Sequence, residues 1–184
     1  MPEAARQLIL AAEALLFASP EPISVARLCE LLSPEGATPE EIKKALAELD
    51  EQYKSTGRAF RIIPVAEGYR IMTRDDMAPV IERLNPPRRS KGITDASMET
   101  LAVVAYRQPI SRAQIETVRG VNSEAALRNL LEKGMLAPTG RSEEPGRPLL
   151  YGTTPEFLKY FNLASLDDLP KERDFPQTSV REKA

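Results

Sequence analysis

The sequence predicts a mainly α-helical chain with small β-wings, an α+β fold made of two tandem winged-helix (winged helix-turn-helix) domains. Three observations lead to this prediction. The 184 residues suffice for two small domains, because a domain needs at least about 50 residues to bury a useful core. Residues 22–28, PISVARL, align with residues 109–115, PISRAQI. Around each copy, three helical patterns precede two strand patterns, which is the winged-helix order of elements.

The three helices of the first half are predicted from apolar spacing and from capping residues. An apolar run from Gln7 to Ala18 predicts the first helix. Ser24 can cap a second helix that continues to Leu32. Residues 38–41, TPEE, supply an N-cap, an N1 proline and a capping-box glutamate. A third helix is therefore expected to run to about Lys54.

After Gly57 the apolar period changes to two, which predicts a β-hairpin. The alternating residues are Phe60, Ile62 and Val65 on one strand and Tyr69, Ile71 and Thr73 on the other. Glu67-Gly68 is the expected turn, because glycine adopts the backbone conformations that tight hairpins need. A further short helix is expected from Met77 to Leu84.

The second half repeats this order of elements. Thr94 or Asp95 is expected to open a helix through Tyr106, and Ser111 with Gln114 forms a capping box for a helix closed by Gly120. The third helix is predicted from Ser123 to Lys133, with Gly134 as its stop. Strands are predicted at 135–139 and 149–153 around a loop at 140–148. Thr154-Pro155 should begin a last short helix that carries Phe157, Leu158 and Phe161.

Composition along the chain sets the expected domain boundaries. Residues 1–85 form an N-terminal winged-helix domain, and residues 86–93, rich in proline and arginine, form a linker. Residues 94–169 form a C-terminal winged-helix domain. Residues 170–184 are dominated by charged and polar types and by proline, so we expect a disordered tail there.

The residue types argue against an enzyme. The chain has no histidine and one cysteine, Cys29, for which we expect a buried structural role. No phosphate-binding glycine motif is present in the sequence, and the adjacent carboxylate pairs point in different directions on a helix or strand. We therefore predict no catalytic, cofactor-binding or metal-ligating residue. An enzyme would need a convergent acid, base or metal cluster.

The charge distribution argues against a dedicated DNA-binding protein. The formal net charge is −2, with 10 basic against 14 acidic residues up to Pro86 and 15 against 13 after it. The third helix of the first half is acidic. That of the second half offers Arg128 and Lys133 against Glu124 and Glu132. We predict weak or indirect DNA contact, because affinity for DNA comes largely from phosphate neutralisation. A winged-helix transcription regulator is the alternative function.

No apolar run in the sequence reaches the roughly 18 residues of a membrane-spanning helix. The apolar run near the N-terminus also lacks a basic leader and a signal-peptide cleavage pattern. We therefore expect a cytoplasmic protein without membrane contact.

The first helix carries more apolar surface than a small domain needs, since only Glu13 interrupts the run from Leu8 to Ala18. Either the helix is central and wrapped by its own domain, or it also packs against a partner or a second copy. For the second alternative, the expected dimer-interface residues are Leu8, Ile9, Ala12, Leu15 and Leu16.

Long segments of the chain resemble the segregation and condensation protein B (ScpB) family, the adaptor of the bacterial SMC–kleisin complex. The matching segments are residues 99–112 (ETLAVVAYRQPISR), 114–123 (QIETVRGVNS), 146–154 (GRPLLYGTT) and 157–170. The resemblance extends from about Gln7 to Pro170. One departure is Asn162, where the family usually has glycine, and asparagine tolerates the same left-handed backbone.

The resemblance implies a homodimer that binds the central segment of the kleisin ScpA and, through it, the SMC ATPase. The implied role is chromosome condensation and segregation during cell division, in a complex associated with the nucleoid. We expect apolar burial to dominate kleisin binding. The expected kleisin-binding residues of the second domain are Arg112, Arg119, Arg147 and Tyr151.

Overall fold

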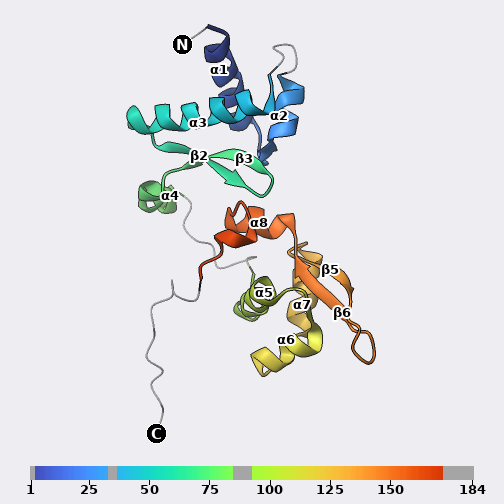
Figure 1. Cartoon of the computed structure of the whole chain (residues 1–184). Helices are drawn as coiled ribbons and strands as arrows, with labels where there is room; N and C mark the ends of the chain where they lie inside the picture. Colours follow the sequence, from blue (N-terminus) through green and yellow to red (C-terminus); the bar gives the residue numbers. More distant parts are fainter. Residues whose placement is uncertain (1–2, 33–36, 85–92, 172–184) are drawn as a thin grey trace.

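The computed structural model describes residues 3–32, 37–84 and 93–171 (Figure 1). Its α-helices are α1 (Glu3–Ala18), α2 (Val25–Leu31), α3 (Pro39–Ser55), α4 (Ala78–Leu84), α5 (Asp95–Arg107), α6 (Arg112–Arg119), α7 (Glu124–Glu132) and α8 (Pro155–Phe161). Its strands are β1 (Ile23–Ser24), β2 (Phe60–Val65), β3 (Gly68–Thr73), β4 (Ile110–Ser111), β5 (Leu136–Arg141) and β6 (Leu149–Thr153). Two 3-10 helices span Asp75–Met77 and Leu166–Asp168. The predicted linker 86–93 and tail 170–184 lie almost entirely outside the described residues.

Both halves have the winged-helix order of elements, as predicted from the sequence repeat. In each half a long helix, a two-residue strand and two more helices precede an antiparallel hairpin. Each short strand joins its hairpin, so two three-stranded sheets form, ordered β1-β3-β2 and β4-β6-β5. The fold class is therefore mainly α with two small β-wings. The short strands β1 and β4 were not expected, because two residues give no readable period.

The two sheets share a cross-strand arrangement of residue types. In the first sheet, Tyr69 pairs with Ile23 on one side and with Pro64 on the other. In the second sheet, Tyr151 pairs with Ile110 and with Pro138. Both tyrosines are half-buried and pack against the core of their own half. The two halves thus share equivalent positions, Tyr69 and Tyr151, that a constant sequence offset does not align.

The predicted helix caps are confirmed. The Ser24 hydroxyl accepts the amide N–H of Arg27, and capping boxes are present at Thr38 with Glu41 and at Ser111 with Gln114. Gly120 closes α6 in the left-handed conformation, with φ of 72°. Asn162 closes α8 in the same way, with φ of 54°, as the asparagine substitution led us to expect.

The predicted turn at Glu67-Gly68 is wrong by one residue. Val65 pairs with Gly68, so the two turn residues are Ala66 and Glu67, and Ala66 takes the left-handed conformation with φ of 51°. Gly68 lies in β3, where a Cβ would lie 2.9 Å from the backbone C and O of Ile23. The glycine is thus required for the close approach of β1. In the second wing, β5 begins and ends later than predicted and contains an irregularity between Pro138 and Gly140.

Separate apolar cores stabilise the two halves. In the first half α1, α2, α3 and the sheet contribute two adjoining clusters, and Leu28, Ile42 and Ala12 are completely buried. In the second half α5, α6, α7 and α8 pack around Val104, Ile115 and Leu130. The expectation that Cys29 is buried is only partly met, because this free cysteine is half-buried at the edge of the first core.

Candidate functional site

Helix α1 divides its apolar residues between the core and the surface. Ile9, Ala12 and Leu16 are buried in the first half, and Leu8 and Leu15 are half-buried against the same core. The five residues expected at a dimer interface are therefore the ones that face their own domain. This arrangement matches the alternative of a central helix wrapped by its own fold.

The opposite side of α1 carries a second apolar stripe. Leu10 is 48% exposed and Phe17 is 79% exposed, and the exposed Ala14 lies between them. The spacings of four and three residues place all three on one side of the helix. We name Leu10, Ala14 and Phe17 the α1 outer face. The sequence contained this signal, because a helical wheel separates these positions from Ile9, Ala12 and Leu16.

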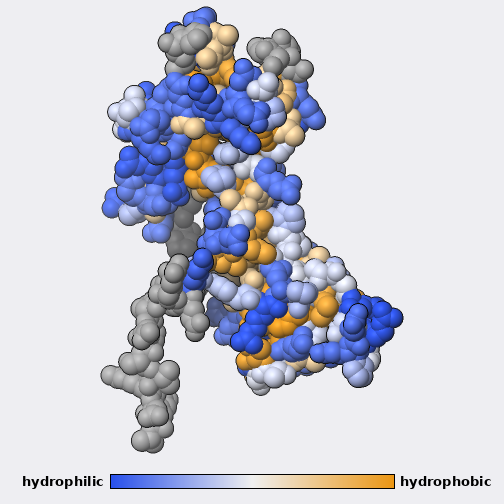
Figure 2. All heavy atoms as spheres, in the orientation of Figure 1, coloured by the Kyte–Doolittle hydropathy of each residue, from blue (hydrophilic) through white to orange (hydrophobic). Residues whose placement is uncertain are grey.

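An open, mainly apolar hollow of about 510 Å³ lies between the end of α1, β1 and α2. Its lining includes Leu15, Ala18, Ile23 and Leu31. A second hollow, of about 700 Å³, lies between the N-terminal part of α1 and α3. Exposed apolar side chains next to such hollows are typical of protein-interaction surfaces. On the face shown in Figure 2, hydrophobic surface occurs on both halves, including the region around α8.

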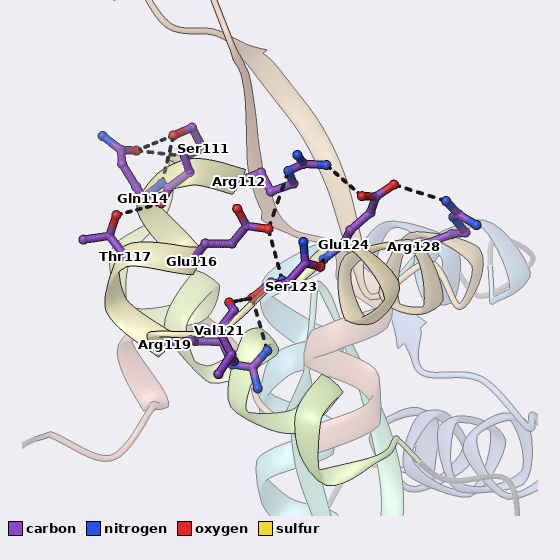
Figure 3. A network of polar contacts seen from close by, with 12 residues as sticks. Ser111, Arg112, Gln114, Glu116, Thr117, Arg119, Val121, Ser123, Glu124 and Arg128 are labelled. Carbon is purple, nitrogen blue, oxygen red and sulfur yellow. Dashed lines mark hydrogen bonds and ion pairs between the residues drawn. The ribbon is translucent and has the colours of Figure 1, made fainter.

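Arg119 lies inside a polar network that joins α5, α6 and the start of α7. Figure 3 shows the part of this network between α6 and α7. Its side chain is only 6% exposed. One terminal nitrogen, Nη1, donates to the hydroxyls of Thr100 and Ser123, at 2.9 and 3.1 Å, and Nη2 donates to Glu99 at 2.7 Å. Arg119 is one of the four expected kleisin-binding residues, and its side chain thus directs its hydrogen bonds into its own domain.

Arg112 and Arg128 flank an acidic residue at the start of the third helix of the second half, as Figure 3 shows. Glu124 lies 3.3 Å from the Arg112 guanidinium and 3.4 Å from that of Arg128. Arg112 also lies 3.7 Å from Glu116. These ion pairs are half-exposed or exposed to solvent, so each contributes at most about 1 kcal/mol. Their effect is to neutralise the cations beside the third helix.

Arg147 and Tyr151 occupy different parts of the second wing. Arg147 lies in the loop between β5 and β6 with φ of 42°, and its carbonyl accepts a hydrogen bond from Arg141. Its side chain is exposed and makes no polar contact within the described part of the chain. Tyr151 lies on the central strand β6, beside Ile110. The structure places Tyr151 and Arg112 on either side of the short β4 strand, whereas Arg147 belongs to the loop that precedes β6.

Two buried or half-buried groups in the first half have shifted pKa values. Burial, reinforced by a 2.6 Å hydrogen bond to Glu13, raises the pKa of Tyr53 well above its usual value. Burial alone would raise the pKa of the Asp50 carboxyl, but the hydrogen bonds from Lys54 and from the Ile62 amide lower it overall. Both groups tie α3 to a neighbouring element, α1 or β2. Neither lies in a cluster suited to chemistry.

Within residues 3–32, 37–84 and 93–171, no group of three or more histidine, cysteine, aspartate or glutamate side chains has an arrangement that could hold a metal ion. Over the same residues, no helix combines the length and apolar character needed to cross a bilayer.

Comparisons with known proteins match most of the chain. A family model described as "Segregation and condensation complex subunit ScpB" matches residues 10–172. The segregation and condensation protein B of Symbiobacterium thermophilum is 47% identical over 158 residues, which are 86% of this chain and 70% of the relative. The crystal structure of ScpB from Mycobacterium tuberculosis is 31% identical and covers 86% of this chain and 97% of its own, with a TM-score of 0.41. A crystal structure of a dimer of an ScpB N-terminal domain complexed with an ScpA peptide is 23% identical and covers 44% of this chain and 98% of its own, with a TM-score of 0.40.

Proposed function

This chain belongs to the segregation and condensation complex subunit ScpB family, and from that premise we propose that it is a non-enzymatic adaptor of a bacterial SMC–kleisin complex. In this proposal a homodimer binds the central segment of the kleisin ScpA, and the kleisin connects it to the SMC ATPase. The assembly supports chromosome condensation and segregation during cell division. It acts in the cytoplasm, associated with the nucleoid through the complex.

The observation that carries this proposal is the family match from residue 10 to residue 172, which includes both winged-helix units. An adaptor needs surfaces for other polypeptides, and the two hollows beside α1 have mainly apolar linings. The test is a pull-down with the central segment of the kleisin, followed by mass measurement of the complex. We expect a stable complex that contains two copies of this chain. Failure to retain the kleisin segment would contradict the proposal.

For the kleisin contact, we propose that apolar burial supplies most of the affinity and that exposed residues of the second half orient the segment. Arg112, Arg147 and Tyr151 retain exposed or half-exposed side chains. For Arg119 we propose an indirect role, because its guanidinium bonds Thr100, Ser123 and Glu99. It would hold α5 and α6 in the arrangement that presents Arg112.

For the homodimer, we propose self-association through the first half with the α1 outer face at the contact. Phe17 is among the most exposed large apolar side chains of the described residues. Burying a side chain of this size contributes about 1.5–3 kcal/mol. In a two-fold symmetric dimer each residue contributes twice.

A winged-helix transcription regulator is the alternative function, and the charge arrangement around α7 argues against it. In DNA-binding winged helices the third helix can enter the major groove. Here Glu124 is paired with both Arg112 and Arg128, so the cations nearest to the groove would be neutralised. We expect weak and nonspecific DNA binding in a gel shift at low salt, and none at physiological salt. A sequence-specific footprint at physiological salt would favour the regulator.

A further inference from the structure

The two halves contact each other through α8 and the turn that follows it. The amide N–H of Ala66, in the first hairpin turn, donates to the carbonyl of Leu163 with an N···O distance of 2.7 Å. The Nζ atom of Lys159 lies 3.0 Å from the Glu21 carboxylate, in the segment between α1 and β1. Figure 1 shows α8 between the first hairpin and the other helices of the second half.

The hydrophobic cores do not cross this contact. Phe157 fixes α8 in the second core, together with Leu158 and Leu163. Each of the three apolar clusters among the described residues lies entirely within one half. The two contacts described above are both polar, and the side chains of Lys159 and Glu21 are 31% and 64% exposed.

Lys159 is shared between the two halves. Glu156, one turn earlier on α8, lies 2.8 Å from the same Nζ atom. The hydrogen bonds to Glu156 and Glu21 raise the pKa of Lys159, so the ammonium stays charged at neutral pH. The ion pair with Glu156 lies within the second half, whereas the ion pair with Glu21 connects the two halves.

We propose that α8 is an electrostatic latch between the two winged-helix halves. In the closed arrangement, the Glu21–Lys159 ion pair and the Ala66–Leu163 hydrogen bond hold the halves together. In the open arrangement both contacts are broken, and the halves are connected only covalently, through residues 85–92. The ion pair makes the closed population depend on ionic strength, because exposed charges are screened by salt. A polypeptide bound across both halves would select one arrangement, and only this consequence rests on the proposed function.

The test measures the distance between the halves in the full chain without any partner. Cys29→Ala removes the native thiol, and Ala47→Cys on α3 with Ala125→Cys on α7 provides exposed sites for nitroxide labels. Labelled chains are diluted with unlabelled chains, so that pulsed electron–electron double resonance reports distances between the two labels of one chain. Glu21→Gln and Glu156→Gln form a matched pair, since each removes one carboxylate charge from the same Lys159 ammonium.

At about 0.1 M sodium chloride we expect one dominant distance in the parent chain. Glu21→Gln should raise the open-to-closed ratio about two- to fivefold, in line with the modest strength of exposed ion pairs. Glu156→Gln should leave the closed population unchanged or increase it, because Lys159 is released to Glu21. Raising sodium chloride to about 1 M should reproduce the Glu21→Gln distribution in the parent chain. Identical distributions for Glu21→Gln and Glu156→Gln, or a parent distribution insensitive to salt, would overturn the latch. Kleisin binding plays no part in this measurement, so its outcome is independent of the proposed function.

Discussion

At the residue scale, the structure separates side chains that stabilise the fold from side chains available to partners. Arg112 and Arg119 stand two turns apart on the same helix and had the same expected role. Arg112 is 50% exposed and Arg119 is 6% exposed. A guanidinium inside its own domain stabilises that domain, whereas an exposed one can exchange its weak ion pairs for contacts with a partner.

Arg119→Ala should therefore reduce the free energy of unfolding by about 2–3 kcal/mol, because it removes charged hydrogen bonds to two buried hydroxyls. Urea unfolding followed by circular dichroism measures this loss. Arg112→Ala is the matched control and should cost less than about 0.5 kcal/mol. If Arg119→Ala instead weakened kleisin binding at unchanged stability, Arg119 would be a contact residue.

Tyr53 predicts a pH dependence of stability in alkaline solution. Its hydroxyl donates to Glu13 and its pKa is raised in the folded state, so this stabilisation is fully present below the ordinary tyrosine pKa of about 10. As the pH rises further, the unfolded chain loses the proton first, and the free energy of unfolding should fall by at most about 1.4 kcal/mol per pH unit. Tyr53→Phe should remove this slope. The prediction is contradicted if the free energy of unfolding depends on pH in the same way for both proteins between pH 8 and about 11.

Phe17→Asp should dissociate the proposed homodimer. It places a charge on the α1 outer face in both copies, and the loss of two buried phenylalanines corresponds to at least about a hundredfold weaker self-association. Light scattering over a concentration series provides the measurement. Val80→Asp on α4 is the control, because Val80 is another exposed apolar residue of the first half, at 61%. Dissociation by Val80→Asp alone would move the dimer contact to α4.

At the scale of secondary-structure elements, the sequence predicted most helices and both hairpins, because caps and apolar spacing are local signals. Thr38, Ser111 and Asn162 each perform the capping role that their residue type suggests. The misplaced first hairpin turn arises because the position of one residue is set by a segment distant in the sequence. Glycine is a typical turn residue, but Gly68 is required in β3 because the backbone of Ile23 lies directly against it. Likewise, the exposure of Arg119 depends on α5, which no local pattern around α6 reveals.

Gly68→Ala tests this reassignment of the first hairpin. A Cβ at Gly68 would lie 2.9 Å from the carbonyl group of Ile23, so β1 must move, and we expect a loss of about 1–3 kcal/mol of stability. Ala66→Gly is the opposite change, since glycine relieves the left-handed backbone at φ of 51°, and should be neutral or stabilising. Thermal unfolding of both variants gives the comparison. Equal destabilisation by both changes would favour a different turn.

At the scale of the whole molecule, the near-neutral chain predicts how the complex responds to salt. The formal net charge is −2, and the apolar hollows lie beside exposed apolar side chains of the first half. Raising sodium chloride from about 0.1 to 1 M shortens the Debye length from roughly 10 to 3 Å, which weakens a charge-driven contact and spares an apolar one. Affinity for the kleisin segment, measured by isothermal titration, should change less than about a hundredfold. A larger loss would identify an electrostatic interface.

The domain boundaries also belong to this scale. The separate cores of residues 8–71 and 93–169 support the proposal that 1–85 and 94–169 are independent domains joined by 86–93.

The paired prolines of the two wings determine how strands from other chains can meet this protein. Pro64 and Pro138 are exposed and lie on β2 and β5, the edge strands of the two sheets. An edge strand normally offers a row of amide donors on which a foreign strand can assemble, and such rows lead to fibrils as readily as to specific complexes. Proline has no amide N–H to donate. On β2 the neighbouring outward amide, that of Ile62, already donates to the Asp50 carboxylate. The row of donors is thereby interrupted on both edge strands, which disfavours templated sheet growth there. The protein can thus remain a discrete particle while its helices and sheet faces stay open to partners.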